Sequence, residues 1–365
     1  MKANDIRNLD SVPSPSLLVF PGRIERNIRK MLAMVGGDTT RLRPHVKTHK
    51  MKEVILMQVE AGITQFKCAT LAEMEMTASS GGKDILLAYQ PVGPNIDGFL
   101  RLQEHFPDVN FSTVVDSLEI ARAFDAAGKH VNLFLDIDCG MHRTGIEPGT
   151  EALAICRAIR ESQNLQFAGL HVYDGHIHDA DLDDRANAHL SSLKTWSGFL
   201  DQLREEGLEP PTIVTGGSPT FALFARTEWQ CSPGTTLLWD AGYGSAYPDL
   251  GFEIAAMLLS RVVSKPGGNR ICLDLGHKAV AGENPLEQRI VIPGLPDAVP
   301  VMHSEEHLVM EVPDAHSIDI GTGFLATPWH ICPTVALHDK AHVVRDGTAT
   351  GEIWEVTARN RLTNI

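Results

Sequence analysis

The chain has 365 residues, of which 43% are hydrophobic, and a formal net charge of −14. This length suits one large domain with a smaller one, or two of middling size. The negative charge argues against nucleic acid and anionic membranes as partners. No apolar run approaches the roughly 20 residues that a membrane helix needs.

Two further features of the composition predict a cytoplasmic protein. The N-terminal stretch MKANDIRNLD is too polar for a signal peptide. Six cysteines stand at positions 68, 139, 156, 231, 272 and 332 without a CxxC pair. This scatter is typical of reduced thiols rather than of a disulfide framework.

Residues 12–245 alternate between short β-rich runs and segments with helical spacing, after a polar arm at residues 1–11. An apolar run at 16–20 and a helix at 24–35 come first. The predicted barrel strands are 42–46, 65–69, 84–88, 111–115, 131–137, 166–172, 212–215 and 229–231. The helices between them are 51–61, 71–79, 96–105, 117–127, 150–161, 185–206 and 221–225. Eight strands in this rhythm predict a (β/α)8 barrel.

From residue 246 to 365 helical periodicity largely stops. Strands separated by Gly and Pro turns are predicted at 258–264, 270–275, 287–292, 308–311 and 353–359. This pattern indicates a small antiparallel β domain that follows the barrel.

The segment 41–50, RLRPHVKTHK, places Lys47 where the first barrel strand opens into a loop. Burial and neighbouring positive charge would lower the pKa of its amine, which could then form a Schiff base with an aldehyde. Arg43, His45, His49, Lys50 and Lys52 would supply that positive charge. The alternative is an ordinary solvated basic loop.

Further candidates follow the other predicted strands, where a β/α barrel carries its chemistry. After strands 7 and 8, Gly216, Gly217 and Ser218, then Gly234 and Thr235, would expose backbone N–H groups to a phosphate. Ordinary tight turns are the alternative. Arg143 follows strand 5 and could bind a cofactor oxygen or a substrate carboxylate, or tie loops together. His171 and Tyr173 end strand 6, where they could neighbour a cofactor ring or pack the rim.

His330 and Cys332 are two residues apart in the predicted β domain, so that in a strand their side chains share a face. Imidazole and thiolate are preferred ligands of Zn²⁺. A buried Cys beside a rim His is the alternative. Glu306 and His307 could belong to the same cleft or only begin a turn. His176 is an acid–base candidate that could equally be a surface histidine.

These motifs together resemble the D-threonine aldolase and D-serine dehydratase family, fold type III pyridoxal-phosphate enzymes related to alanine racemase. The resemblance rests on RPHVKTHK (43–50), MHRTG (141–145), YDGH (173–176), GGSPT (216–220), SPGT (232–235), SEEH (304–307) and HIC (330–332). It implies that Lys47 is the Schiff-base lysine and that His330 and Cys332 hold a divalent metal near the cofactor. It further implies a barrel with a β domain, a D-amino acid substrate and a homodimer.

The expected activity is a pyridoxal-phosphate- and metal-dependent lyase for β-hydroxy D-amino acids, with Lys47, Arg143 and His176 as catalytic candidates. Dehydration of D-serine or 3-hydroxy-D-aspartate is expected first, because the thiolate in His-x-Cys favours Zn²⁺ over Mn²⁺ or Mg²⁺ and resembles the dehydratase branch. Retro-aldol cleavage is the alternative. An amino-acid racemase usually needs a β-domain tyrosine, whereas the four tyrosines here all precede residue 248. A pyridoxal-phosphate carrier would lack the β domain.

Overall fold

The structure, a computed structural model, describes residues 5–365. The chain forms two compact units, each assembled from separate stretches of sequence. The unit with the parallel sheet, here the barrel unit, comprises 31–47, 55–234 and 360–365. The other, here the sheet unit, comprises residues 5–30, 48–54 and 235–359. The domain limits 12–245 and 246–365 stay a prediction.

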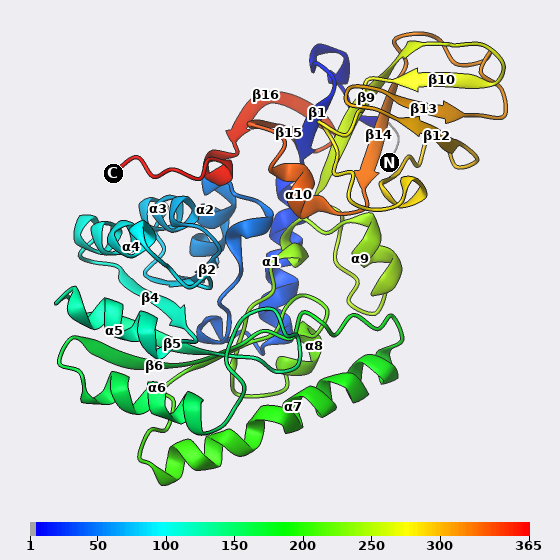
Figure 1. The fold of residues 1–365 in the computed structure, drawn as a ribbon. Helices are drawn as coiled ribbons and strands as arrows, with labels where there is room; N and C mark the ends of the chain where they lie inside the picture. Colours follow the sequence, from blue (N-terminus) through cyan, green and yellow to red (C-terminus); the bar gives the residue numbers. More distant parts are fainter. Residues whose placement is uncertain (1–4) are drawn as a thin grey trace. The chain divides into compact units, whose positions relative to one another are not determined.

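The barrel unit is built on a seven-stranded parallel sheet in the order β2-β3-β4-β5-β6-β7-β8 (Figure 1). Its strands are β2 (Gln65–Cys68), β3 (Asp84–Leu87), β4 (Asn110–Val115), β5 (Val131–Ile137), β6 (Leu165–Val172), β7 (Ile213–Thr215) and β8 (Gln230–Cys231). Neighbouring strands are parallel throughout, as helical crossovers require. Leu86, Val114, Phe134 and Val214 from four of these strands pack together as one interior layer.

Residues 42–46 do not form the regular first strand that the sequence predicted. They run between two 3-10 turns, Thr39–Arg41 and Val46–Thr48. Leu42 nevertheless bridges to Cys231 on β8, and His45 bridges to Lys67 on β2, both in parallel. Pro44 has no N–H, and this limits the ladder to isolated bridges. The segment therefore takes the place of an eighth strand, and the β/α barrel prediction is confirmed in this form.

The helices between residues 21 and 224 follow the predicted order, with ends that differ by a few residues. They are α1 (Pro21–Met34), α2 (Lys52–Glu60), α3 (Leu71–Ser79), α4 (Pro94–His105), α5 (Leu118–Ala126), α6 (Thr150–Glu161), α7 (Leu182–Glu205) and α8 (Phe221–Phe224). In α6, Ala152, Ile155, Cys156 and Ile159 are buried at helical spacing, and this helix packs on β5 and β6. Among residues 5–365, no helix combines the length and the apolar character needed to cross a membrane.

The sheet unit contains a nine-stranded sheet whose main path is β12-β13-β10-β9-β1-β15-β16. Its strands are β1 (Ser16–Val19), β9 (Ala256–Ser264), β10 (Arg270–Leu273), β11 (Ile290–Val291), β12 (Val299–His303), β13 (Leu308–Glu311), β14 (Gly323–Pro328), β15 (Lys340–Arg345) and β16 (Thr348–Glu355). Two short helices, α9 (Ala241–Ala246) and α10 (Ile331–Val335), belong to the same unit.

Strands β12, β14 and β15 were not predicted from the sequence, and 287–288 lies in a 3-10 turn, Leu286–Gln288, where a strand was predicted. Two further details of this sheet also differ from the prediction. The first is that β1 pairs antiparallel with β9 and parallel with β15, so that the sheet is mixed rather than purely antiparallel. The second is that 357–359 is a 3-10 turn, whereas the sequence predicted a strand through 359. Leu18, Met257, Leu259 and Leu325 from β1, β9 and β14 pack in one buried cluster. The N-terminal strand is thus part of the core of the sheet unit.

An ion pair between the buried Arg43 and the partly exposed Asp84 fixes the start of the barrel sheet. Arg43, 2% exposed, places Nη1 2.7 Å from Asp84 Oδ1 and Nη2 3.1 Å from Oδ2. Its Nε donates to Gln230 Oε1 at 2.8 Å. Arg43 therefore joins the 42–46 segment to β3 and β8.

Replacing Asp84 with Ala is expected to lower the free energy of unfolding by about 3 kcal/mol, because Arg43 would remain buried without its counter-charge. The exposed pair Asp201–Arg204, also at 2.7 Å, provides the matched control. Asp201→Ala is expected to cost less than about 1 kcal/mol. Denaturant unfolding of both variants measures the difference, and equal effects would contradict the importance of burial.

Candidate active site

A cavity of about 500 Å³ opens at the carboxyl ends of the barrel strands. Strands β2 to β6, the segment before the 3-10 turn and the loop after β5 all contribute to it. Its lining residues are His45, Lys47, Lys67, Ala69, Ala88, Tyr89, Gln90, Val92, Val114, Asp116, Asp136, Arg143, Thr144, His171 and Tyr173. Five of the predicted site residues thus lie in one cavity, namely His45, Lys47, Arg143, His171 and Tyr173.

The ring of Tyr173 is the centre of a cluster of cations. Lys47 Nζ lies 5.8 Å from the ring centroid, and Lys67 Nζ lies 5.5 Å from it. Arg143 Cζ is 5.0 Å from the same centroid. These distances suit cation–π attraction, which holds positive charge over an aromatic face. Such a cluster favours an anionic ligand.

Lys67 was not identified from the sequence, although a signal was present. It is a charged residue in the middle of QFKCA, a run that otherwise reads as a buried strand. Its Nζ lies 3.5 Å from His171 Nε2, and His171 Nδ1 lies 2.6 Å from Asp136 Oδ1. Asp136, in VNLFLDI, carried the same signal and was likewise missed.

The positive surroundings of Lys47 differ from those expected. Arg43 is paired with Asp84, so its charge is largely compensated. Burial lowers the pKa of His49 to about 3, so this ring is neutral at pH 7. His45 is buried and accepts a hydrogen bond at Nδ1 from the Lys47 N–H at 3.3 Å. Lys67 is instead the buried cation source that lines the cavity with Lys47.

Arg143 is exposed, and the loop that carries it is fixed by two aspartates. Asp138 Oδ1 accepts from the N–H groups of Gly140 and His142 at 2.9 and 3.0 Å. Asp116 Oδ2 accepts from the Gly145 N–H at 3.0 Å. The loop backbone is therefore held while the guanidinium remains accessible to a ligand.

The two predicted phosphate loops meet in the barrel unit. The Gly234 N–H donates to Ser218 Oγ at 3.2 Å. Gly216 has a φ of +66°, a conformation that favours glycine. At Gly217 a Cβ would lie 3.0 Å from Tyr173 Cε2, so the missing side chain leaves room beside that ring. This open backbone is a cradle that fits a phosphate group.

Replacing Gly217 with Leu is expected to weaken retention of pyridoxal phosphate by at least about tenfold, because the side chain would meet Tyr173 and occupy the cradle. Gly198→Leu is the control, since a Cβ at that exposed position on α7 has no neighbour within 4 Å. Equilibrium dialysis against the cofactor measures retention. Unchanged affinity in the Gly217 variant would remove the cradle from the site.

His176 does not line the cavity formed around Tyr173. It is partly buried, and a Cβ on Gly140 would lie 3.3 Å from its Nε2. Its buried Nδ1 finds no hydrogen-bond partner within residues 5–365. A catalytic role for His176 stays a prediction that these contacts do not support.

The sequence predicted that His330 and Cys332 lie in a strand. The structure shows that they do not. Strand β14 ends at Pro328, His330 is the N-cap of α10, and Cys332 lies in that helix. Pro328 and Pro333 flank the pair, and proline is tolerated at a strand edge or in a first helical turn but not within a strand ladder. The two side chains nevertheless lie close enough for Cys332 to raise the pKa of His330. The capping geometry, rather than strand alternation, brings them together.

Polar groups of the sheet unit surround this pair. Glu283 Oε1 lies 2.7 Å from His330 Nδ1, which leaves Nε2 as the ring nitrogen available to a metal. Thr48 and Thr235 place Oγ1 3.2 and 3.6 Å from Cys332 Sγ. Hydrogen bonding and charge at Cys332, with help from Glu283, raise the pKa of His330 to about 9 against the effect of burial.

Thr235 thus contacts the thiol, although the sequence grouped it with the phosphate loop. Within the described chain, no three His, Cys, Asp or Glu side chains cluster as a complete metal site. The imidazole and the thiol could therefore supply two ligands to a metal ion. Glu306 and His307 are exposed in the turn between β12 and β13, where Glu306 lies 3.3 Å from Lys278.

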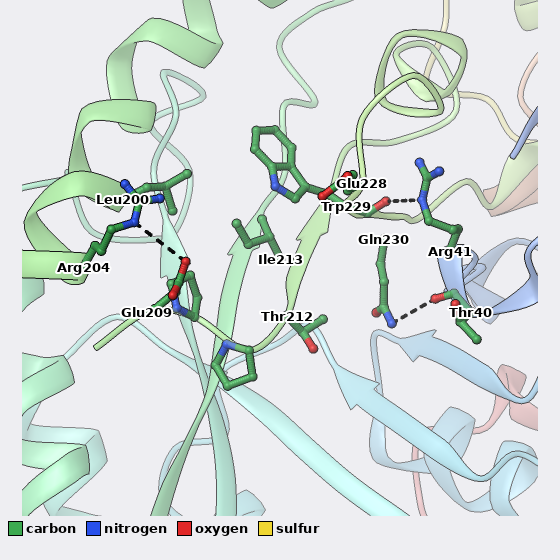
Figure 2. Close-up of a pocket in the computed structure, with 12 residues that line it drawn as sticks. Thr40, Arg41, Leu200, Arg204, Glu209, Thr212, Ile213, Glu228, Trp229 and Gln230 are labelled. Carbon is green, nitrogen blue, oxygen red and sulfur yellow. Dashed lines mark hydrogen bonds and ion pairs between the residues drawn. The ribbon is translucent and has the colours of Figure 1, made fainter. Parts of the chain in front are cut away.

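A second cavity of about 520 Å³ lies at the amino-terminal side of β7 and β8 (Figure 2). Figure 2 shows that its polar side chains bond to neighbouring groups of the wall. Arg41 Nε donates to the Trp229 carbonyl at 3.1 Å, Gln230 Nε2 donates to the Thr40 carbonyl at 3.2 Å, and Arg204 pairs with Glu209 at 3.8 Å. None of the predicted site residues lines it, so it is not the candidate active site.

Comparison with known proteins agrees with the fold. Residues 21–240 match the family model "Alanine racemase, N-terminal domain", and residues 255–344 match "Putative serine dehydratase domain". The chain is 30% identical to D-threonine aldolase of an Arthrobacter species, over 96% of this chain and 94% of the relative. It is 29% identical to 3-hydroxy-D-aspartate aldolase of Paracoccus denitrificans, over 96% and 93%.

Among solved structures, D-threonine aldolase from Filomicrobium marinum superposes with a TM-score of 0.88 at 28% identity. The match covers 96% of this chain and 97% of that one. It extends over both the parallel and the mixed sheet. The chain therefore belongs to the alanine racemase N-terminal domain family of fold type III pyridoxal-phosphate enzymes, within the group of D-threonine aldolases and D-serine dehydratases, and is a lyase.

Proposed function

We propose that the protein is a pyridoxal-phosphate- and divalent-metal-dependent lyase that acts on β-hydroxy D-amino acids. The observation that carries the proposal is Lys47 beside Tyr173 in a cavity whose other cations are Lys67 and Arg143. The relatives named above supply the substrate class, since they are aldolases for D-threonine and 3-hydroxy-D-aspartate.

The residues present fit the cofactor. Lys47 provides the amine, and its backbone N–H is fixed by His45. The Gly216–Ser218 turn, tied to Gly234, provides the open backbone for a phosphate. Bound pyridoxal phosphate supplies an electron sink that weakens the bonds of the substrate α-carbon. The protein selects the bond to be broken by orienting the substrate, and the exposed Arg143 is placed to hold a carboxylate.

The side chains also fit a metal. His330 and Cys332 combine a nitrogen and a sulfur donor, the set that Zn²⁺ prefers over Mn²⁺ or Mg²⁺. A bound divalent ion supplies a Lewis acid for the β-hydroxyl of the substrate. Glu283 orients the His330 ring through Nδ1. In the sequence, Thr48 follows Lys47 and Thr235 follows Gly234, so both threonines beside Cys332 adjoin proposed cofactor-binding residues.

Of the two possible outcomes we propose retro-aldol cleavage to glycine and an aldehyde. The two aldolase relatives, each aligned over 96% of the chain, support it. Dehydration to a keto acid and ammonia is the second candidate. It is supported by the thiol of Cys332 and by the match of residues 255–344 to the serine dehydratase domain.

A product assay distinguishes the outcomes. Purified protein with pyridoxal phosphate and Zn²⁺ or Mn²⁺ is given D-threonine, D-serine and 3-hydroxy-D-aspartate, with their L-forms as controls. Glycine together with an aldehyde is the expected product, whereas ammonia with a keto acid would establish the dehydratase. If none of the three D-amino acids is turned over and D-alanine is racemised instead, the lyase proposal is overturned.

We further propose that the protein is a homodimer, because the resemblance to alanine racemase-like enzymes implies cofactor sites that are completed across subunits. Sedimentation velocity is expected to give about twice the mass of one chain at micromolar concentration. A fully active species that sediments as one chain would exclude a shared site.

A further inference from the structure

A second lysine lines the candidate cofactor cavity, and it is more deeply buried than Lys47. Lys67 is 2% exposed and lies on β2, where its neighbours Phe66 and Cys68 are fully buried. A lysine amine is seldom enclosed to this extent unless a partner receives its proton or its charge. Within the described residues, the one side-chain hydrogen bond of Lys67 joins Nζ to His171 Nε2 at 3.5 Å.

The direction of this hydrogen bond follows from the contact that the other ring nitrogen of His171, Nδ1, makes. His171 Nδ1 lies 2.6 Å from Asp136 Oδ1, and a carboxylate can only accept. Nδ1 therefore carries the proton, and in the neutral ring Nε2 is an acceptor. Lys67 Nζ is accordingly the donor at the end of a row of three buried groups. His171 and Asp136 are 5% and 7% exposed.

We propose that Lys67 is a second proton-exchanging residue of this cavity, and that His171 and Asp136 stabilise its protonated form. The catalytic part of this proposal rests on the proposed function. In the forward direction the lone pair of neutral Nζ takes a proton from a bound amino acid, and the bonding electron pair stays on that molecule. The ammonium formed then donates an N–H to His171 Nε2. The reverse step returns the proton. The electron sink that the retained pair requires would be supplied by the cofactor of the proposed function.

The charges around Lys67 suit such an exchange. Burial lowers the pKa of Lys67 to about 7, and Lys47 and Arg43 act in the same direction. Asp136 and Asp174 oppose the shift. Further neighbours are His45, which is its bridge partner, the His171 ring and the Tyr173 ring, over which Arg143 also lies. Because the protonated and neutral forms are both populated near neutral pH, the amine can serve as acid or base.

The first test needs neither cofactor nor substrate. Apoprotein labelled with [6-¹³C]lysine is titrated by NMR from pH 5 to 11, and one resonance is expected to shift with a midpoint near 7, whereas exposed lysines titrate near 10.4. That resonance should be missing from Lys67→Met. If every lysine resonance of the wild-type protein titrates above about pH 9, Lys67 is a fixed cation and the proposal is overturned, whether or not the variant folds.

The second test connects the titration to chemistry. Exchange of the α-hydrogen of D-alanine in D₂O is followed by proton NMR as a function of pH. Lys67→Met and Lys67→Arg are expected to slow exchange by about 10²-fold and to lose the inflection near pH 7, since neither variant has an amine that titrates there. Lys83→Met, at an exposed position before β3, is the control. An unchanged pH profile in both Lys67 variants would overturn the proposal.

These results are separable from those that test the proposed function. A titrating Lys67 in a protein without lyase activity would support the proton-exchange assignment and reject the function. A lyase with no lysine titrating near pH 7 would do the reverse.

Discussion

Replacing Lys47 with Ala is expected to reduce lyase activity by at least about 10³-fold, because the group that would hold the cofactor covalently is lost. The structure provides the reason for choosing this lysine. Its side chain is half-buried, lines the cavity and faces the Tyr173 ring at 5.8 Å. Lys52→Ala, at an exposed position five residues later, is the matched control and should retain activity.

The covalent assignment has a measurement of its own. Wild-type protein is reduced with borohydride in the presence of pyridoxal phosphate, digested and mapped by mass spectrometry. The pyridoxyl group is expected on Lys47. The cavity contains one other lysine, Lys67, so an adduct on Lys67 in the wild-type protein would exchange the proposed roles of the two amines. An adduct outside the cavity would refute the site.

Most of the fold could be predicted from the sequence because strand and helix spacing alternate clearly between residues 65 and 231. The prediction failed where local chemistry interrupts the pattern. Residues 42–46 have the composition of a strand, but Pro44 cannot donate to a ladder, and only isolated bridges form. The sequence of Ser16–Val19 does not indicate with which strands it pairs. Its partners β9 and β15 lie far along the chain.

The candidate site was predictable to the extent that its residues stand at strand ends. Lys47, Arg143, His171 and Tyr173 were selected in that way, and the structure brings them into one cavity. Lys67 and Asp136 were not predicted because both lie within strands rather than in the loops that follow them. A charged side chain inside an apolar run needs a partner for its charge or has a functional role. Lys67 and Asp136 could have been identified from the sequence on that ground. The contacts that join Lys67 and Asp136 through His171 could be identified only from the structure.

The second large effect is expected at the His330–Cys332 pair. The structure indicates that a metal bound there would not be needed to hold the fold. The backbone around the pair is held by protein groups alone. The Ile331 N–H donates to Asp240 Oδ2 at 3.0 Å, and Thr334 Oγ1 donates to the His330 carbonyl at 2.8 Å. Asp240 also accepts from the Tyr243 N–H at 2.8 Å. Since these bonds need no ion, removal of a metal should leave the fold intact.

Chelation is therefore expected to abolish lyase activity while the cofactor absorbance and the unfolding midpoint remain nearly unchanged. Cys332→Ala should weaken Zn²⁺ binding by roughly 10²-fold or more and lose activity in the same way, because half of the ligand pair is removed. Cys272→Ala, a buried cysteine on β10, controls for loss of a thiol.

The chemistry of the second ligand gives the sharper comparison. Cys332→Asp should recover activity with Mn²⁺ in preference to Zn²⁺, since a carboxylate is the harder ligand. Metal titration with activity and thermal unfolding recorded together measures all of these variants. Full turnover of D-threonine by metal-free protein would show that the ion has no catalytic part. A large fall in the unfolding midpoint on chelation would instead identify a structural site, because a metal that holds the fold contributes its binding free energy to stability.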